Sequence, residues 1–172
     1  MSNLEALIKN LSQTWPMPSN TSPIVIIGTG GIVKDAHLPA YKKAGFNVVG
    51  LYDVEKEKAE KLAEEFEIKR VFDSIEEAFD NKDCIFDLAL PPANLLEVVE
   101  RLPENVYAIL QKPLGRSLEE GNKIRKICHK KNIKACMNFQ LRFSPISLPV
   151  YEAIEQNILG ELVELEVHVN VH

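Results

Sequence analysis

The stretch IVIIGTGGIV, residues 24–33, decides how this chain folds. Four β-branched apolar residues run into glycines and then into a segment of helical character, which is the order of a buried parallel strand, a tight turn and a helix start. Gly28 would permit the turn and Gly30 a close backbone approach, while the N–H groups and dipole of the next helix favour a phosphate. The stretch therefore predicts a phosphate-binding turn. Because Val33 replaces the third small residue of the G-x-G-x-x-G pattern, an ordinary strand-to-helix turn is the alternative.

An acidic residue ends the second apolar run of the chain. This run covers residues 46–52, and Asp53 follows it. A carboxylate about 20 residues beyond such glycines meets the ribose hydroxyls of a dinucleotide. It would accept from both hydroxyls and repel a 2′-phosphate, so we expect NAD as the cofactor in preference to NADP. The alternative is a turn or N-cap residue before a helix that begins near Glu55.

Apolar runs and helix-like segments alternate along residues 24–138. This alternation predicts an α/β fold built on a doubly wound parallel sheet, a Rossmann fold. Pro39 interrupts the first helix and requires a kink or a restarted turn, and Gly45 would end that helix. Strands are expected at residues 24–27, 46–52, 69–72, 84–90, 107–110 and 133–138, and helices at residues 31–44, 55–66, 94–101 and 117–131, with another begun by the cap at residues 73–74.

The composition predicts three parts of unequal size. Apolar residues at helical spacing favour an amphipathic helix at residues 3–13, and a proline-containing connector follows it. We therefore expect an N-terminal helix and linker at residues 1–22 and a dinucleotide-binding domain at residues 23–145. Residues 146–172 form the third part, a helix followed by one strand.

The end of the chain alternates strictly between apolar and polar residues. After a helix expected at 146–157, residues 163–171 show the period of two that is typical of a strand with one buried face. An unpaired strand exposes both a backbone edge and a row of apolar side chains. We expect it to pair with another chain in a homo-oligomer, or to be disordered in isolation. His168 and His172 are interpreted as surface positions, and no metal site is predicted.

Composition and charge exclude several classes of function. The chain has 172 residues, 45% of them hydrophobic, and a net charge of −5. No basic run is longer than a pair such as Lys130-Lys131, so the chain lacks the electrostatic footprint of a nucleic-acid-binding protein. No signal pattern or membrane-length apolar run is present, so no membrane partner is expected. Three cysteines without C-x-x-C spacing favour a reducing, cytoplasmic setting.

Further candidates follow the predicted strands, where ligands of doubly wound folds collect. Pro91 and Pro92 end one strand. Lys112 comes just past another, where its amine would face the cleft; an exposed surface lysine is the alternative. His37, in the first helix, could line the cofactor pocket or be satisfied by local backbone.

Together these motifs resemble the glucose-fructose oxidoreductase/inositol dehydrogenase/rhizopine-catabolism (Gfo/Idh/MocA) family. The resemblance covers residues 24–171 and implies an N-terminal Rossmann domain that binds NAD(P) and a C-terminal domain on an open, largely antiparallel sheet that binds a sugar, polyol or related substrate. The residues that carry it are the glycine turn at 28–32, the HLPA segment at 37–40, Asp53, Pro91-Pro92, Lys112-Pro113 and the NFQLRFSP stretch at 138–145.

The resemblance also implies roles for individual residues. Lys112 matches the lysine of the family's Glu-Lys-Pro motif, which acts near the reacting carbon, so it is the expected catalytic residue. Two positions depart from the family pattern: Gln111 stands in place of the glutamate, and the histidine expected soon after Pro91 is missing. The implied cofactor-binding residues are Gly28, Thr29, Gly30, Gly31, Ile32, Asp53, Leu90, Pro91, Pro92, Gln111 and Lys112.

The implied activity is hydride transfer between a nicotinamide cofactor and a sugar, polyol or related hydroxy compound. The resemblance implies that residues 146–172 supply a helix and only the first strand of the family's second, α+β domain. Most of that domain has no counterpart in these 172 residues, so we expect no turnover by this chain alone. The alternative is a dinucleotide-binding module without catalysis, acting as a sensor or subunit. An S-adenosylmethionine methyltransferase would share the glycine turn and the acid, but residues 90–93 lack the polar and aromatic neighbours of an adenine-methyltransferase Pro-Pro.

Overall fold

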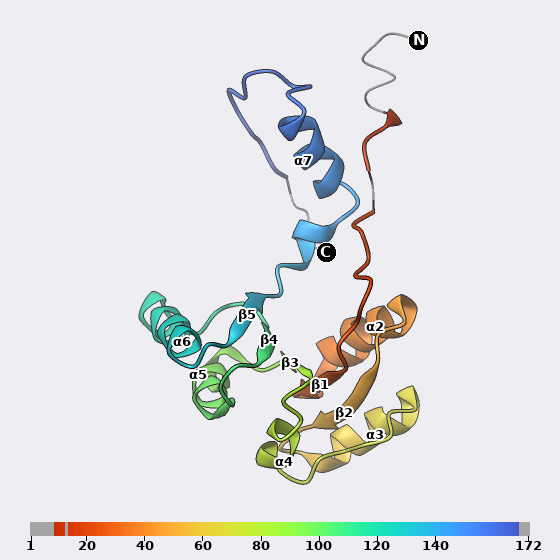
Figure 1. Cartoon of the computed structure of the whole chain (residues 1–172), viewed down its shortest axis with the longest axis vertical. Coiled ribbons are helices and arrows are strands. Elements are labelled where there is room, and N and C mark those ends of the chain that lie inside the picture. Colours follow the sequence, from red (N-terminus) through yellow and green to blue (C-terminus); the bar gives the residue numbers. More distant parts are fainter. Residues whose placement is uncertain (1–8, 13, 169–172) are drawn as a thin grey trace. The chain divides into compact units, whose positions relative to one another are not determined.

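The computed structural model describes residues 9–12 and 14–168, which fall into two compact units (Figure 1). The sheet unit is Ser19–Asn138; the terminal unit combines Met1–Pro18 with Phe139–His172. Most of the predicted helix 3–13 lies outside the described residues, as does the segment 169–172 with His172. Within the described ranges, no helix is both long and apolar enough to cross a membrane.

The sheet unit is built on a five-stranded sheet in which every neighbouring pair is parallel. Ile27 lies level with Tyr52 of the second strand and with Leu88 of the third, so the loops that follow these strands meet at one edge. The predicted α/β fold with a doubly wound parallel sheet is confirmed. The strand order is β2-β1-β3-β4-β5, with β1 at Ile24–Ile27, β2 at Val48–Tyr52, β3 at Ile85–Leu88, β4 at Tyr107–Leu110 and β5 at Lys134–Met137.

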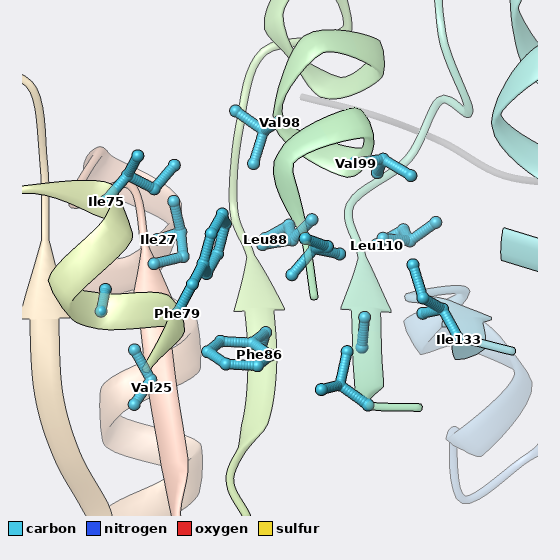
Figure 2. Packing of buried hydrophobic residues seen from close by; sticks show 14 of the residues in the cluster. Val25, Ile27, Ile75, Phe79, Phe86, Leu88, Val98, Val99, Leu110 and Ile133 are labelled. Carbon is cyan, nitrogen blue, oxygen red and sulfur yellow. The ribbon is translucent and has the colours of Figure 1, made fainter. Parts of the chain in front are cut away.

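Helices cover both faces of the sheet, because successive strand residues point to opposite sides. In β1, Val25 and Ile27 pack with α4, α5 and α6, whereas Ile24 and Ile26 pack with α2 and α3. Figure 2 shows the first of these cores, with Phe79 of α4 against Phe86 of β3. The helices are η1 at Val33–His37, α2 at Leu38–Ala44, α3 at Lys56–Phe66, α4 at Ile75–Phe79, α5 at Pro92–Arg101 and α6 at Leu118–Lys130.

Pro39 reshapes the first helix as its chemistry requires. A proline has no N–H, and its ring collides with the carbonyl four residues earlier. The helix therefore widens into the π-helical turn η1, in which the Leu38 N–H donates to the Val33 carbonyl, and restarts as α2 with Pro39 in its first turn. This wide turn buries His37, whose side chain faces the sheet. The expected restart is thus observed.

In the sheet unit, one predicted strand is not formed and one predicted helix begins earlier than expected. Instead of a strand at 69–72, Val71 alone forms a bridge, with Leu51 of β2. The helix expected at 94–101 begins two residues earlier, at Pro92. Proline is favoured at the first helical position because its fixed φ suits the helix and its missing N–H has no helical partner there.

The terminal unit contains the short 3-10 helix η2 (Gln140–Phe143) and α7 (Ser147–Glu155). Trp15 packs edge-on against Phe143, with ring centroids 5.3 Å apart. The strand predicted at 163–171 is not formed over residues 163–168, and Val163 and Leu165 are 93% and 82% exposed. The alternation is present, but a strand needs a neighbour to accept its hydrogen bonds, and these residues have none among the described parts of the chain.

The turn after β1 requires glycine at one position. Gly28 has a φ of 95°, and its N–H donates to the Tyr52 carbonyl at 2.8 Å. A Cβ atom at Gly28 would lie 2.6 Å from the carbonyl oxygen of Ala89. Gly45 ends α2 with a φ of 72°, yet a Cβ there would meet nothing within 4 Å. Both glycines therefore have a left-handed backbone conformation, but only Gly28 lacks room for a Cβ atom.

The loop after β4 is anchored by an ion pair with α6. The Glu120 carboxylate accepts from the backbone N–H of Arg116 at 2.6 Å and from its guanidinium, also at 2.6 Å. These bonds lower the pKa of Glu120 from 4.5 to about 2. The loop that carries Lys112 is thereby tied to the start of α6.

The two glycines provide a matched test of the turn. We expect Gly45→Ala to lower the free energy of unfolding by roughly 1–2 kcal/mol, the usual penalty for an L-residue in left-handed backbone. Gly28→Ala adds a collision with a backbone carbonyl, so it should lower the free energy of unfolding by about 2 kcal/mol more than Gly45→Ala does, or further. Urea unfolding at neutral pH measures the free energy of unfolding of both variants. Equal decreases in the two variants would contradict the close approach of this turn to Ala89.

The Glu120 ion pair predicts a pH dependence. A carboxyl whose pKa is lower in the folded than in the unfolded state stabilises the fold above its unfolded pKa, and this contribution is lost as the pH falls toward the folded pKa. Glu120→Gln should therefore lower the urea midpoint at pH 7, and the difference from the parent should shrink between pH 4.5 and about 2. Glu119→Gln, which removes only an exposed pair with Lys123, is the control and should change less. A pH-independent difference would contradict this assignment.

Candidate functional site

A pocket of about 410 Å³ opens at the edge where β1, β2 and β3 end. Its volume lies within the range of small-molecule sites, and the crevice beyond the carboxyl ends of the strands is where open α/β sheets bind ligands. Six of the residues predicted from sequence line this pocket: Gly28, Thr29, Gly30, Asp53, Leu90 and Pro91.

The carboxylate of Asp53 is fixed at this edge by three hydrogen bonds. Its Oδ2 accepts from the backbone N–H of Thr29 at 2.6 Å and from the Thr29 hydroxyl at 2.8 Å. Its Oδ1 accepts from the backbone N–H of Glu55 at 2.9 Å. Two carboxylate oxygens offer about four lone-pair directions, so Oδ1 retains capacity for another donor. Asp53 therefore makes the expected turn contact with Glu55 and can still accept a hydrogen bond from a ribose hydroxyl.

The glycine turn leaves space beside its backbone. A Cβ atom at Gly30 would meet no heavy atom within 4 Å, so a bulky group can approach the main chain there. Gly31 and Ile32 open the following helix, and their position in its first turn leaves their N–H groups without helical acceptors. Ile32 is 48% exposed, next to this turn. The arrangement suits an anionic group near Gly30 with an apolar neighbour.

The rest of the pocket lining comes mainly from helices and was missed by the sequence reasoning. It includes apolar side chains from α4 and α5 and the charged Lys58 and Arg101, which pair with Glu55 and Glu76. The Pro91-Pro92 pair could have indicated this, because α5 begins there, at the edge of the sheet where the pocket lies. The wall residues are Val54, Glu55, Lys58, Ile75, Asn94, Glu97, Val98 and Arg101.

The other predicted residues lie near the same sheet edge but do not line this pocket. Pro92 begins α5 and lines a separate hollow together with Pro113. Gln111 and Lys112 follow β4, and the Lys112 side chain is exposed. The Lys112 backbone N–H donates to Oε1 of Gln111 at 2.9 Å.

His37 is held by a side chain that the sequence reasoning overlooked. His37 does not line the cofactor pocket, and its partner is not local backbone. Its Nδ1 lies 2.7 Å from Oδ2 of Asp87. The same oxygen accepts a hydrogen bond from the Tyr41 hydroxyl at 2.8 Å. Asp87 is fully buried in the middle of β3. Burial, then the charge of Asp87, raises the pKa of Tyr41. A single acid inside the apolar run CIFDLAL was the signal for this contact.

Comparisons with known proteins agree with the fold. Residues 23–139 match the family described as "Oxidoreductase family, NAD-binding Rossmann fold". Glucose-6-phosphate 3-dehydrogenase of Bacillus subtilis is 26% identical over 146 residues, covering 84% of this chain and 41% of that protein. A Salmonella typhimurium protein described as "Putative oxidoreductase YceM" is 28% identical over 127 residues, covering 73% of this chain and 41% of the relative.

Solved structures show the same likeness. An oxidoreductase from Thermotoga maritima superimposes with a TM-score of 0.70 at 25% identity, covering 83% of this chain and 45% of that one. The chain thus spans about two fifths of the length of the curated relatives it matches. Because the family match covers residues 23–139, more than half of the chain, this chain belongs to the Gfo/Idh/MocA oxidoreductase family, with its NAD-binding Rossmann fold.

Proposed function

We propose that this chain binds a nicotinamide dinucleotide, NAD in preference to NADP, in the pocket beside Gly28 and Asp53. The observation that carries the proposal is the fixed Asp53 carboxylate, which adjoins the glycine turn and keeps an oxygen available for a ribose hydroxyl. A 2′-phosphate at that position would face the same negative charge.

The remaining residues fit the other parts of the cofactor. The pyrophosphate would lie against Gly30, where the backbone is open, and would accept from the N–H groups of Gly31 and Ile32. Leu90 and Pro91 supply apolar surface on the β3 side of the pocket. Bound there, the cofactor would supply the hydride acceptor or donor of an oxidoreductase reaction.

We further propose that the substrate is a sugar, polyol or related hydroxy compound and that Lys112 is the catalytic residue. The similarity to a glucose-6-phosphate 3-dehydrogenase supports the substrate class. Lys112 would orient the substrate hydroxyl and take up or return its proton. A lysine alone cannot hold a substrate or exclude water, so we propose that these 172 residues bind cofactor without turnover.

A dinucleotide-binding module without catalysis is the second candidate. Gln111 favours it, because a neutral amide stands beside Lys112 where the family motif has a carboxylate. Pairing of residues 163–171 with a second copy stays a proposal, supported by the exposure of Val163, Leu165 and Val167. Cys84 and Cys128 are buried free thiols, which supports a reducing, cytoplasmic setting.

Calorimetric titration tests the cofactor proposal. We expect NADH to bind at least about tenfold more tightly than NADPH, a difference of roughly 1.4 kcal/mol. Asp53→Asn removes the negative charge and should narrow this ratio, whereas Asp83→Asn, at an exposed position outside the pocket, should leave it unchanged. Equal affinities of the parent for the two cofactors would contradict the role given to Asp53. NADH formation from NAD and a sugar at about 1 per second or faster would instead contradict the absence of turnover.

A further inference from the structure

Polar side chains from four parts of the sheet unit converge on His37. Tyr41 comes from α2, Asp87 from β3, Gln111 from the residue after β4 and Asn138 from the residue after β5. We call these four residues and His37 the His37 network. His37 is 8% exposed and Asp87 is fully buried, so the contact between them is made away from water, whereas the other contacts are partly buried.

One ring nitrogen of His37 must carry a proton. Its Nδ1 lies 2.7 Å from Oδ2 of Asp87, and a carboxylate can only accept. The Tyr41 hydroxyl also donates to this oxygen, and the raised pKa of Tyr41 keeps that proton in place. On β5, burial and then the charge of Asp87 raise the pKa of Cys136, which stays a neutral thiol. Oδ2 of Asp87 thus accepts one hydrogen bond from the Tyr41 hydroxyl and one from His37 Nδ1.

The other ring nitrogen faces side-chain amides. His37 Nε2 lies 3.1 Å from Nε2 of Gln111 and 3.3 Å from Nδ2 of Asn138. Gln111 cannot turn its oxygen toward His37 without losing a bond, because its Oε1 accepts from the Lys112 backbone N–H at 2.9 Å. Its NH₂ group can only donate. The acceptor is therefore the lone pair of His37 Nε2, which carries no proton.

We propose that Gln111 is a positioning residue: its NH₂ group fixes His37 as the neutral Nδ1–H tautomer, and its carbonyl oxygen holds the backbone of Lys112. One amide thus joins the buried His37–Asp87 pair to the residue at the sheet edge. A glutamate at position 111 could still accept from the Lys112 N–H. It would also require a proton on His37 Nε2, converting the ring to an imidazolium between two carboxylates.

The state of His37 can be measured directly on the whole chain. Long-range ¹H–¹⁵N spectra distinguish the two neutral tautomers and the imidazolium, and His37→Asn assigns the His37 signals among the four histidines. At pH 7.5 we expect the Nδ1–H tautomer in the parent. Gln111→Glu should give the imidazolium pattern, and Asn138→Ala should leave the Nδ1–H pattern unchanged. An Nε2–H or imidazolium pattern in the parent, or no change in Gln111→Glu, would overturn the proposal.

Hydrogen exchange tests the second contact of Gln111. The Lys112 amide should exchange about tenfold faster in Gln111→Ala, because its acceptor is lost, and at the parental rate in Gln111→Glu, because a carboxylate replaces that acceptor. Asn138→Ala, which removes the other amide near His37, should leave this rate unchanged. Parental exchange in Gln111→Ala would overturn the positioning role.

The importance of the Gln111–Lys112 hydrogen bond for catalysis rests on the proposed role of Lys112. The His37 tautomer and the exchange rate of the Lys112 amide are independent of that role, because both are measured without cofactor or substrate. Failure of the Gln111 proposal is therefore distinct from failure of NAD binding, which the calorimetric comparison of NADH with NADPH reports separately.

Discussion

The hydrogen bonds between Thr29 and Asp53 tie the first loop of the sheet to the end of the second strand. Oδ2 of Asp53 accepts twice from Thr29, and the Gly28 N–H donates to the Tyr52 carbonyl. These bonds form only if β1 and β2 are parallel and in register and if the chain can turn at Gly28 against Ala89. The pocket, the fixed carboxylate and the open backbone at Gly30 all follow from that arrangement.

The fold could be predicted because its buried strands are short apolar runs separated by helical segments, two of which begin at clear serine caps. Ile24–Ile27 is apolar on both faces, as a central parallel strand must be, and Ser74 and Ser117 accept from the N–H groups of Glu77 and Glu120 as N-caps do. The segment 163–168 shows the limit of this reasoning. Alternation describes a side-chain pattern, whereas a strand also requires a partner backbone, which lies outside the segment itself.

The candidate site was predictable where its residues follow successive strands at a known spacing, and not where side chains from distant parts of the chain meet. The glycine turn and Asp53 have a fixed separation along the chain, and the structure brings them into one pocket. Arg101 and Asn94 reach the same pocket through the placement of α5, which no local motif encodes. Asp87 and His37 meet across 50 positions because β3 pairs with β1 and the π-helical turn directs His37 toward the sheet.

Titration of the ¹⁵N-labelled chain with NADH, followed in amide ¹H–¹⁵N spectra, shows whether the dinucleotide binds at the edge where β1, β2 and β3 end. We expect the largest chemical-shift changes at the N–H groups of residues 28–32, Asp53 and Leu90, and small changes in α6 and β5. Saturable binding whose shifts cluster around α6 and β5, where a second hollow lies, would contradict it.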